Sequence, residues 1–203
     1  MSEETEDFYS RKAERMDNQF SESRMPQSFL EIRDKFLEEL EEGKILDVGC
    51  GTGRDVEYFI EQGFEALGID SAQGMIERAR RNRKGEFIQK DMLEMEFKED
   101  SFDGIWCCAS IFFLPYEDMK KVLENFQEIL SPEGSLFVSF RKGRGKEKKA
   151  IWGERITQYC LSEEEATKLL ENKGFQINSS ETHEDAPTTF MNFICQAKKT
   201  SKN

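Results

Sequence analysis

The chain has 203 residues, a formal net charge of −12 and a hydrophobic share of 37%. This length is typical of a single domain that buries a sizeable core. The negative charge argues against a large nucleic-acid partner, because an acidic surface repels phosphate groups. The sequence contains no run of 18 apolar residues, so no membrane-spanning helix is predicted. The acidic first residues differ from an ordinary signal peptide.

The five cysteines have no metal-ligand spacing, so we expect no metal site. Their number and positions favour reduced thiols of a cytoplasmic protein over a disulfide framework. They stand at positions 50, 107, 108, 160 and 195.

Two helices are predicted ahead of the first strand. Residues 5–20 have a short amphipathic pattern, and residues 27–41 place their apolar side chains in helical register. Gly43 then ends the second helix. We expect residues 1–42 to form a helical cap outside the core.

The most informative segment covers residues 44–55, which read Lys-Ile-Leu-Asp-Val-Gly-Cys-Gly-Thr-Gly-Arg-Asp. An apolar strand, a glycine-rich turn and the start of a helix are typical of a nucleotide-cofactor site. Glycine suits this turn because a Cβ would keep the ligand away from the backbone. Asp47 lies two residues ahead of Gly49, at the end of the strand. A carboxylate at that position repels a pyrophosphate and suits a cation.

Strand and helix patterns alternate up to residue 140, which predicts an α/β fold with a mainly parallel sheet. The second and third strands end in acids, at Asp70 and Asp91, so three strand ends carry a carboxylate. Further strands are expected over residues 101–110 and 130–139. The predicted helices of this part cover residues 54–62, 72–83 and 117–130.

The pattern changes at residues 141–149, which are basic and contain glycine in an otherwise acidic chain. This segment leaves the fifth strand at the edge where ligands bind in such folds. It is either a mobile lid or a solvated surface loop. A lid of this composition would favour an anionic substrate.

The last part of the chain predicts one helix and a pair of strands. A capping box that starts at Ser162 opens a helix over residues 162–172. Residues 174–179 and 190–196 are expected to form the strand pair. His183, the only histidine, is expected in the turn between these strands, on the ligand-facing rim.

Five elements in this order, with acids at three strand ends, resemble the class I S-adenosylmethionine (SAM) methyltransferases over about residues 44–140. The segment Phe-Asp-Gly-Ile-Trp-Cys-Cys-Ala-Ser at residues 102–110 is similar to that of small stand-alone microbial members, often labelled tellurite-resistance-like. The resemblance implies a Rossmann-like, seven-stranded, mostly parallel sheet of order 3-2-1-4-5-7-6, with an antiparallel last strand and helices on both faces. It divides one domain into a cap (1–42), a cofactor-binding core (43–140) and a substrate side (141–203).

The resemblance also implies how the cofactor is held. In the family, the acid corresponding to Asp70 binds the ribose hydroxyls, and the acid corresponding to Asp91 accepts from the adenine amino group. Arg54 is either a partner for the cofactor carboxylate or a surface charge, and Cys108 lies either beneath the methyl donor or only in the core. The expected cofactor-binding residues are Asp47, Gly49, Cys50, Gly51, Gly53, Arg54, Asp70, Ser71, Asp91, Met92 and Cys108.

No residue pattern identifies a general base. His183 and Tyr9 are the candidates for an acceptor that must lose a proton. The chain lacks the Asn-Pro-Pro-Tyr motif that some relatives carry after the fourth strand, which argues against methylation of amino groups on bases, proteins or RNA. A base is not obligatory, because the methyl group of a sulfonium is already activated and alignment of donor and acceptor accelerates the displacement.

The predicted function is therefore transfer of a methyl group from SAM to a small molecule, with S-adenosylhomocysteine (SAH) as the product, by a monomer or homodimer. A regulator or partner subunit that binds SAM without turnover stays open as an alternative. An NAD-binding oxidoreductase is disfavoured, because residues 49–53 read Gly-x-Gly-x-Gly and lack the Gly-x-Gly-x-x-Gly spacing. The sequence does not identify the methyl acceptor or the atom that is methylated.

Overall fold

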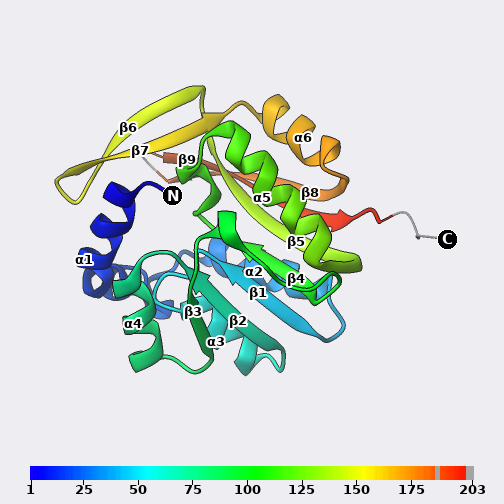
Figure 1. Ribbon diagram of the computed structural model, residues 1–203, viewed down its shortest axis with the longest axis horizontal. Coiled ribbons are helices and arrows are strands. Elements are labelled where there is room, and N and C mark those ends of the chain that lie inside the picture. The colour runs from blue at the N-terminus through cyan, green and yellow to red at the C-terminus, as the bar shows by residue number, and fades with distance from the viewer. Residues whose placement is uncertain (186–187, 200–203) are drawn as a thin grey trace.

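A single twisted sheet with helices on both faces forms the structure, a computed structural model that describes residues 1–185 and 188–199 (Figure 1). Its strands follow the spatial order β3-β2-β1-β4-β5, after which β9 and then β8 continue the sheet, while β7 and β6 pair at the far end of β5. The strands are β1 (Lys44–Val48), β2 (Glu65–Asp70), β3 (Glu86–Gln89), β4 (Phe102–Cys107), β5 (Leu130–Lys142), β6 (Gly145–Ile151), β7 (Glu154–Leu161), β8 (Phe175–Asp185) and β9 (Thr188–Ala197).

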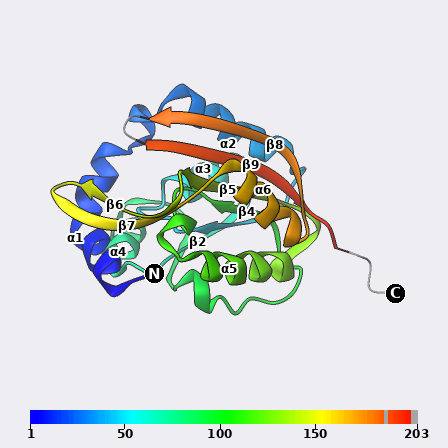
Figure 2. The ribbon, with the colours of Figure 1, turned by 90° about the horizontal axis from the view of Figure 1, so that it is seen from above.

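Helices cover both faces of the sheet (Figure 2). Helices α2 and α3 lie on one face, and α5 and α6 lie on the other. None of the helices formed by the described residues has the length and hydropathy needed to cross a membrane. The helices are α1 (Glu3–Gln19), α2 (Gln27–Glu38), α3 (Arg54–Glu61), α4 (Gln73–Asn82), α5 (Tyr116–Ile129) and α6 (Glu163–Asn172), with 3₁₀ turns η1 (Glu22–Arg24), η2 (Met92–Glu94) and η3 (Ile111–Phe113).

The expected sheet order is confirmed, with β9 and β8 as the last two strands of the predicted series. Strands β1 to β5 are parallel, and β9 runs antiparallel to β5. The predicted helices agree with the observed ones within a few residues at their ends. The parallel arrangement brings the carboxyl ends of β1, β2, β3 and β4 to one edge, which is where the candidate site lies.

Two features of the last third differ from the sequence prediction. Residues 141–149 do not form an open loop, because β5 continues to Lys142 and β6 begins at Gly145. Strands β6 and β7 pair along seven residues and form an antiparallel hairpin beside α1 (Figure 1). His183 lies within β8, opposite Phe190, and not in a turn, because the last two strands are longer than their apolar cores suggested.

The face of the sheet under α2 and α3 is organised around one large aromatic side chain. Trp106 is fully buried and stacks on Phe137 with 3.8 Å between ring centroids. Phe36 of α2 and Phe59 of α3 pack on the same indole. Burying such aromatic surface contributes strongly to stability, and here it fixes α3, whose first turn follows the glycine loop.

A buried carboxylate joins this aromatic core to the glycine loop. Asp55, in the first turn of α3, accepts hydrogen bonds from Trp106 Nε1 at 3.2 Å and from Arg33 of α2 at 3.1 Å. Arg54 Nη2 lies 2.7 Å from its second oxygen. Burial opposes ionisation of Asp55, but the two guanidinium groups outweigh it and hold the pKa of this carboxyl below its usual value. Asp55 therefore stays ionised, and it fixes α2 against the start of α3.

We expect Asp55→Ala to destabilise the protein by about 3–5 kcal/mol, because it leaves the buried guanidinium of Arg54 without a carboxylate and leaves Arg33 with the exposed Glu22 alone. The free energy of unfolding from urea titration followed by circular dichroism measures this. Glu117→Ala is the matched control, since this exposed carboxylate pairs only with Lys120 at the surface, and its cost should stay within about 0.5 kcal/mol. Equal effects of the two substitutions would contradict the role given to Asp55.

Candidate cofactor site

The glycine loop after β1 is held tightly against the end of β4. Gly49 has a φ of +78°, and a Cβ added to it would lie 2.4 Å from Cβ of Ser110. Ser110 Oγ donates a hydrogen bond to the carbonyl of Val48 at 2.8 Å. Only glycine allows both the left-handed backbone and this close approach. The strand ends of β1 and β4 are therefore locked in register at the site.

Gly51 marks the open side of the same loop. Its φ is +54°, and a Cβ added there would meet no atom within 4 Å. Its N–H donates to Oδ2 of Asp70 at 3.0 Å, and Oδ1 of Asp70 accepts from the N–H of Ala72 at 2.8 Å. The loop thus leans on the acid at the end of β2 and presents bare backbone to the space beside it.

Asp70 is half-buried at this position. Burial raises its pKa from the usual 3.8 to about 6, although the two backbone N–H donors favour the ionised form. A carboxylate oxygen has lone pairs for more than one donor. Asp70 can therefore accept hydroxyl donors from a ligand in addition to Gly51 and Ala72.

Asp47 is a buried carboxylate with an oxygen that no group of the protein contacts by a hydrogen bond. It is 2% exposed, and its Oδ2 atom has no hydrogen-bond partner. Burial, followed by the negative charge of Asp55, raises its pKa well above the usual range. An unpaired buried carboxyl is costly unless a donor or a cation reaches it. The residue thus fits a ligand that brings a positively charged group to the end of β1.

A cavity of about 70 Å³ lies beside these strand ends. Six of the expected cofactor-binding residues line it: Gly49, Gly51, Asp70, Ser71, Asp91 and Met92. The remaining walls come from the N-terminal segment, α4 and the segment that follows β4, namely Met1, Tyr9, Met16, Ile69, Met75, Lys90, Ala109, Ser110 and Phe113. The positive φ of Ala109, 52°, has no signal in the sequence.

Asp91 and the N-terminal residue occupy the far end of this cavity. Asp91 Oδ1 accepts from the N–H of Leu93 at 2.9 Å, and its Oδ2 lies 2.6 Å from the amino group of Met1. The Met1 side chain packs on the hydrophobic core beside it. The helical cap therefore reaches across the cavity, and an amine already occupies one acceptor atom of Asp91.

The two candidates for a general base are placed differently. Tyr9 lines the cavity, with its ring 5.4 Å from that of Phe113, and burial followed by the charge of Asp70 raises its pKa. Its hydroxyl is therefore protonated at neutral pH and donates rather than removes a proton. His183 is not among the lining residues; its Nε2 lies 3.4 Å from Glu181.

Five other expected residues do not line the cavity. Asp47 is buried within β1, two residues before Gly49, which does line it. Gly53 is the N-cap of α3, and Cys50 is buried between α3, α4 and β3. Arg54 is engaged by Asp55 and by the carbonyl of Phe20 at 3.1 Å. Cys108 packs on the Trp106 side of the sheet. The structure thus gives Arg54 and Cys108 contacts within the protein.

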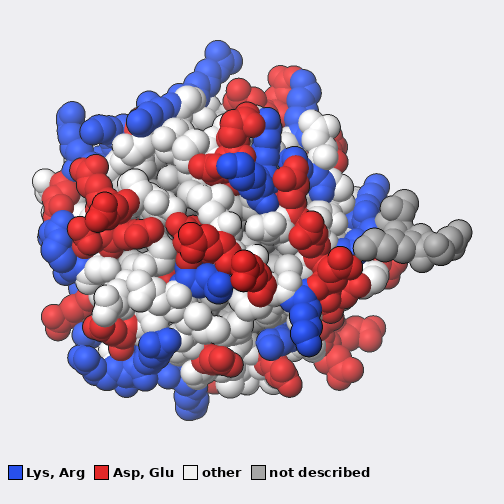
Figure 3. Space-filling view, viewed as in Figure 1, with Lys and Arg blue, Asp and Glu red and all other residues white. Residues whose placement is uncertain are grey.

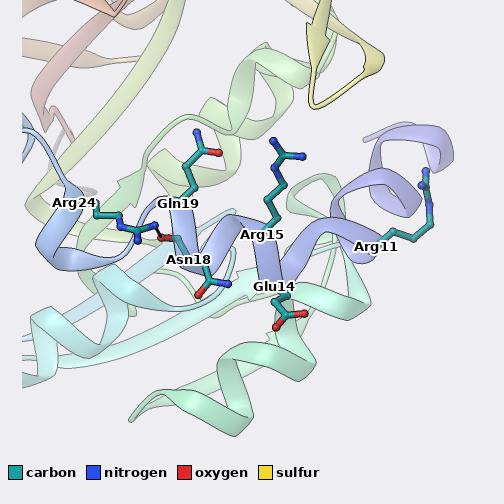
Figure 4. Close-up of a pocket in the computed structure, with 6 residues that line it drawn as sticks. All are labelled: Arg11, Glu14, Arg15, Asn18, Gln19 and Arg24. Carbon is teal, nitrogen blue, oxygen red and sulfur yellow. Dashed lines mark hydrogen bonds between the residues drawn. The ribbon is translucent and has the colours of Figure 1, made fainter.

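A larger hollow of about 600 Å³ lies on the outer side of α1 and η1 (Figure 4). Its lining residues are Arg11, Glu14, Arg15, Asn18, Gln19 and Arg24. Glu14 points away from the arginines, so the side chains do not converge on one point (Figure 4). This hollow lies away from the strand ends, and its side chains do not enclose a ligand as those of a typical binding pocket do.

Comparison with known proteins agrees with this placement. The methyltransferase domain family matches residues 45–134. A phosphoethanolamine N-methyltransferase of Plasmodium falciparum is 30% identical over 148 residues, which cover 69% of this chain and 54% of that protein. The chain thus spans about half the length of this curated relative.

Solved structures show the same fold. A SAM-dependent methyltransferase of Methanosarcina mazei aligns with a TM-score of 0.74 and 19% identity, covering 83% of this chain and 98% of that one. The 1,6-didemethyltoxoflavin-N1-methyltransferase of Burkholderia thailandensis, solved with its substrate and SAH, aligns with a TM-score of 0.74 and 18% identity over 97% and 90%.

The family match begins at β1 and includes the glycine loop and the acids that follow β2 and β3. The fold supplies the expected strand order around them. Together they show that the chain contains a domain with the sequence pattern and the fold of the class I SAM-dependent methyltransferases.

Proposed function

We propose that this protein transfers a methyl group from SAM to a small-molecule acceptor. The observation that carries the proposal is the buried Oδ2 of Asp47, which has no partner in β1, together with the open backbone of Gly51 in the loop that follows. The cofactor's ammonium group supplies the cation that Asp47 lacks. Such a pairing would favour the ionised form of Asp47 and lower its pKa.

The other two acids would hold the nucleoside. Asp70 has room for the ribose hydroxyls in addition to its two backbone donors. Asp91 would accept from the adenine amino group, once the amino group of Met1 leaves its Oδ2. The cavity of about 70 Å³ is smaller than the 300 Å³ or more typical of pockets for such ligands, so we expect α1 to shift outward when SAM binds.

The contribution of the protein to the reaction would be alignment. SAM supplies a methyl group on a positively charged sulfur, which needs no further activation. Tyr9 and Phe113 cover the cavity and exclude water from it. With the Tyr9 hydroxyl protonated and His183 outside the lining, the chain would act by holding the acceptor in line with the methyl group.

The names of two similar proteins support a small-molecule acceptor, since phosphoethanolamine and 1,6-didemethyltoxoflavin are both small molecules. The chain itself is acidic, which disfavours nucleic acid. A cytoplasmic location, a monomeric or homodimeric state and the domain division at residues 42 and 140 stay predictions. Binding without turnover stays the alternative, and release of SAH during incubation with a panel of metabolites distinguishes the two.

We expect Asp47→Asn to weaken SAH binding at least about tenfold, because the amide cannot pair with the ligand's ammonium group. Asparagine has the size of aspartate, and Oδ2 of Asp47 has no partner within the protein. The substitution therefore removes no hydrogen bond of the protein at that atom. Isothermal titration calorimetry measures the dissociation constant. Asp70→Ala should also abolish micromolar binding.

Asp118→Asn is the matched control for these variants, since it removes an equal charge from the outer surface of α5. Its dissociation constant should equal that of the wild type. Equal affinities of Asp47→Asn and wild type would show that the ammonium group binds elsewhere.

The affinity for SAH should depend on pH through Asp70. Its pKa of about 6 means that the free protein holds a proton on this group below pH 6, whereas ribose hydroxyls donate to the ionised form. Binding must then release the proton, so the affinity should fall by up to about tenfold per pH unit as the pH decreases below 6, and Asp47, whose pKa is also raised, strengthens the same trend. Calorimetric titrations from pH 5 to 8 test this, and constant affinity over the range would contradict it.

A further inference from the structure

We propose that Arg141 and Gln158 form a binding site for an anionic group, a carboxylate or a phosphate, on the methyl acceptor. This proposal rests on the methyltransferase activity proposed above, and it adds the substrate class. Arg141 is the penultimate residue of β5, and Gln158 lies in the middle of β7. Both residues belong to the segment after residue 140, where the chain forms the β6–β7 hairpin.

Strand register places these side chains on one face of the sheet. Arg141 is opposite Cys160 of β7 and opposite Phe190 of β9, and Phe190 is in turn opposite His183 of β8. Gln158 precedes Cys160 by two residues, so it projects to the same side. With neighbouring strands about 4.8 Å apart and residues about 3.3 Å apart along a strand, this row places Arg141 about 8 Å from Gln158 and about 10 Å from His183, with Gln158 and His183 at its opposite ends.

Each of these three side chains has a polar atom without a hydrogen-bond partner. The atoms are Nε of Arg141, Oε1 of Gln158 and Nε2 of His183. Arg141 and Gln158 are each only 4% exposed. Buried polar groups are nearly always paired, and an unpaired one needs an explanation. Here a donor and an acceptor stay unpaired side by side, which suits a ligand that brings both an anion and an N–H or O–H group.

Arg141 also has the geometry of an anion-binding group. Its Nη1 donates to Thr188 Oγ1 at 2.9 Å, and the guanidinium carbon lies 5.7 Å from the centre of the Phe190 ring. These contacts fix the planar group while its Nε–H stays free. A fixed guanidinium with a free N–H binds carboxylate and phosphate oxygens strongly and with defined geometry.

Aromatic contacts connect this position to the cofactor cavity. The Phe190 ring lies 5.8 Å from that of Phe112, which neighbours Phe113 in the cavity wall. A hydrogen bond makes a second connection along β5. Ser139 Oγ, two residues before Arg141, accepts from the N–H of Ala109 at 2.6 Å. Aromatic side chains, Phe190, Phe112 and Phe113 in sequence, thus form a layer between Arg141 and the cavity. An acceptor with an apolar body would span this layer and place its anion on Arg141.

The β6–β7 hairpin closes over this region through its contact with α1. Trp152 stacks on Phe8 at 5.9 Å, and its Nε1 donates to Gln19 at 2.9 Å. Arg11 pairs with Glu154, and both side chains are more than one third exposed. Exposed pairs of this kind contribute little, so the hairpin can move away from α1 to admit a ligand.

The charge of the hairpin favours anions as well. Lys146, Lys148 and Arg155 are exposed on it, although the chain as a whole is acidic. Figure 3 shows Lys and Arg side chains gathered at the upper left, where the hairpin lies, and Asp and Glu across the front of the molecule. A local positive field beside the entrance would attract an anionic acceptor and raise its association rate.

The experiment uses the full chain saturated with SAH and three small probes, benzoate, phenyl phosphate and benzamide. Binding is measured by calorimetry and by NMR line broadening of each probe. Benzoate or phenyl phosphate should bind to the wild type, and Arg141→Gln should weaken that binding by about tenfold or more. Benzamide has the shape of benzoate without its charge, so it should bind no more strongly to the wild type than to the variant. The tighter of the two anions identifies the group that the site takes.

Arg155→Gln is the matched control, because it removes the same charge from an exposed position on the hairpin. Its loss of affinity for the anions should stay within about twofold, because an exposed charge contributes only to the surrounding field. Arg141→Lys keeps the charge without the planar fork, and it should lie between the wild type and Arg141→Gln; it replaces Arg141→Gln if that variant does not fold by circular dichroism. Failure of both anions to bind the wild type, or equal losses in Arg141→Gln and Arg155→Gln, would overturn the proposal.

The two proposals fail separately in this design. Titration with SAH alone reports on the cofactor site, and the probe titrations report on Arg141. SAH binding without any anion binding would leave the proposed methyltransferase activity standing and remove Arg141 as an acceptor site. Anion binding to a protein that does not bind SAH would do the reverse.

Discussion

The site depends on one hydrogen bond, from the backbone N–H of Gly51 to the carboxylate of Asp70. It joins the loop after β1 to the end of β2, so the position of the loop is set by the neighbouring strand and not by the loop alone. Ser110 fixes the other side of the loop through the carbonyl of Val48. Because parallel strands bring these ends to one edge, two local contacts between neighbouring strands are enough to build a ligand-binding surface.

This arrangement concentrates electrostatic cost at the place where the ligand binds. Asp47 is buried and Asp70 is half-buried, and burial raises the pKa of each. Asp55 is buried like Asp47 but has two guanidinium partners that hold its pKa down. The protein thus neutralises the acid that supports the fold and leaves the acids at the strand ends incompletely paired. A cationic ligand with hydroxyl donors relieves that cost, and binding and protonation are therefore coupled.

The sequence predicted the part of the fold that depends on local patterns. Apolar strands, the glycine turn around Gly51 and the capping box at Ser162 each have a short signal, and each element was confirmed within a few residues. The β6–β7 hairpin was missed because β6 is rich in lysine and has few apolar residues, a pattern that a solvated loop shares. The conformations of Ala109 and Arg141 have no signal in the sequence for another reason. Their positions depend on contacts with Ser139 and Thr188 that are distant along the chain.

The most direct test of the central claim is a crystal structure of the protein with SAH. The account predicts the ligand's amino group within hydrogen-bond distance of Asp47, its ribose hydroxyls on Asp70 and its adenine at Asp91, with Met1 displaced from that carboxylate. It would be contradicted by SAH bound away from the strand ends of β1 and β2, or by a complex in which Asp47 Oδ2 stays unpaired.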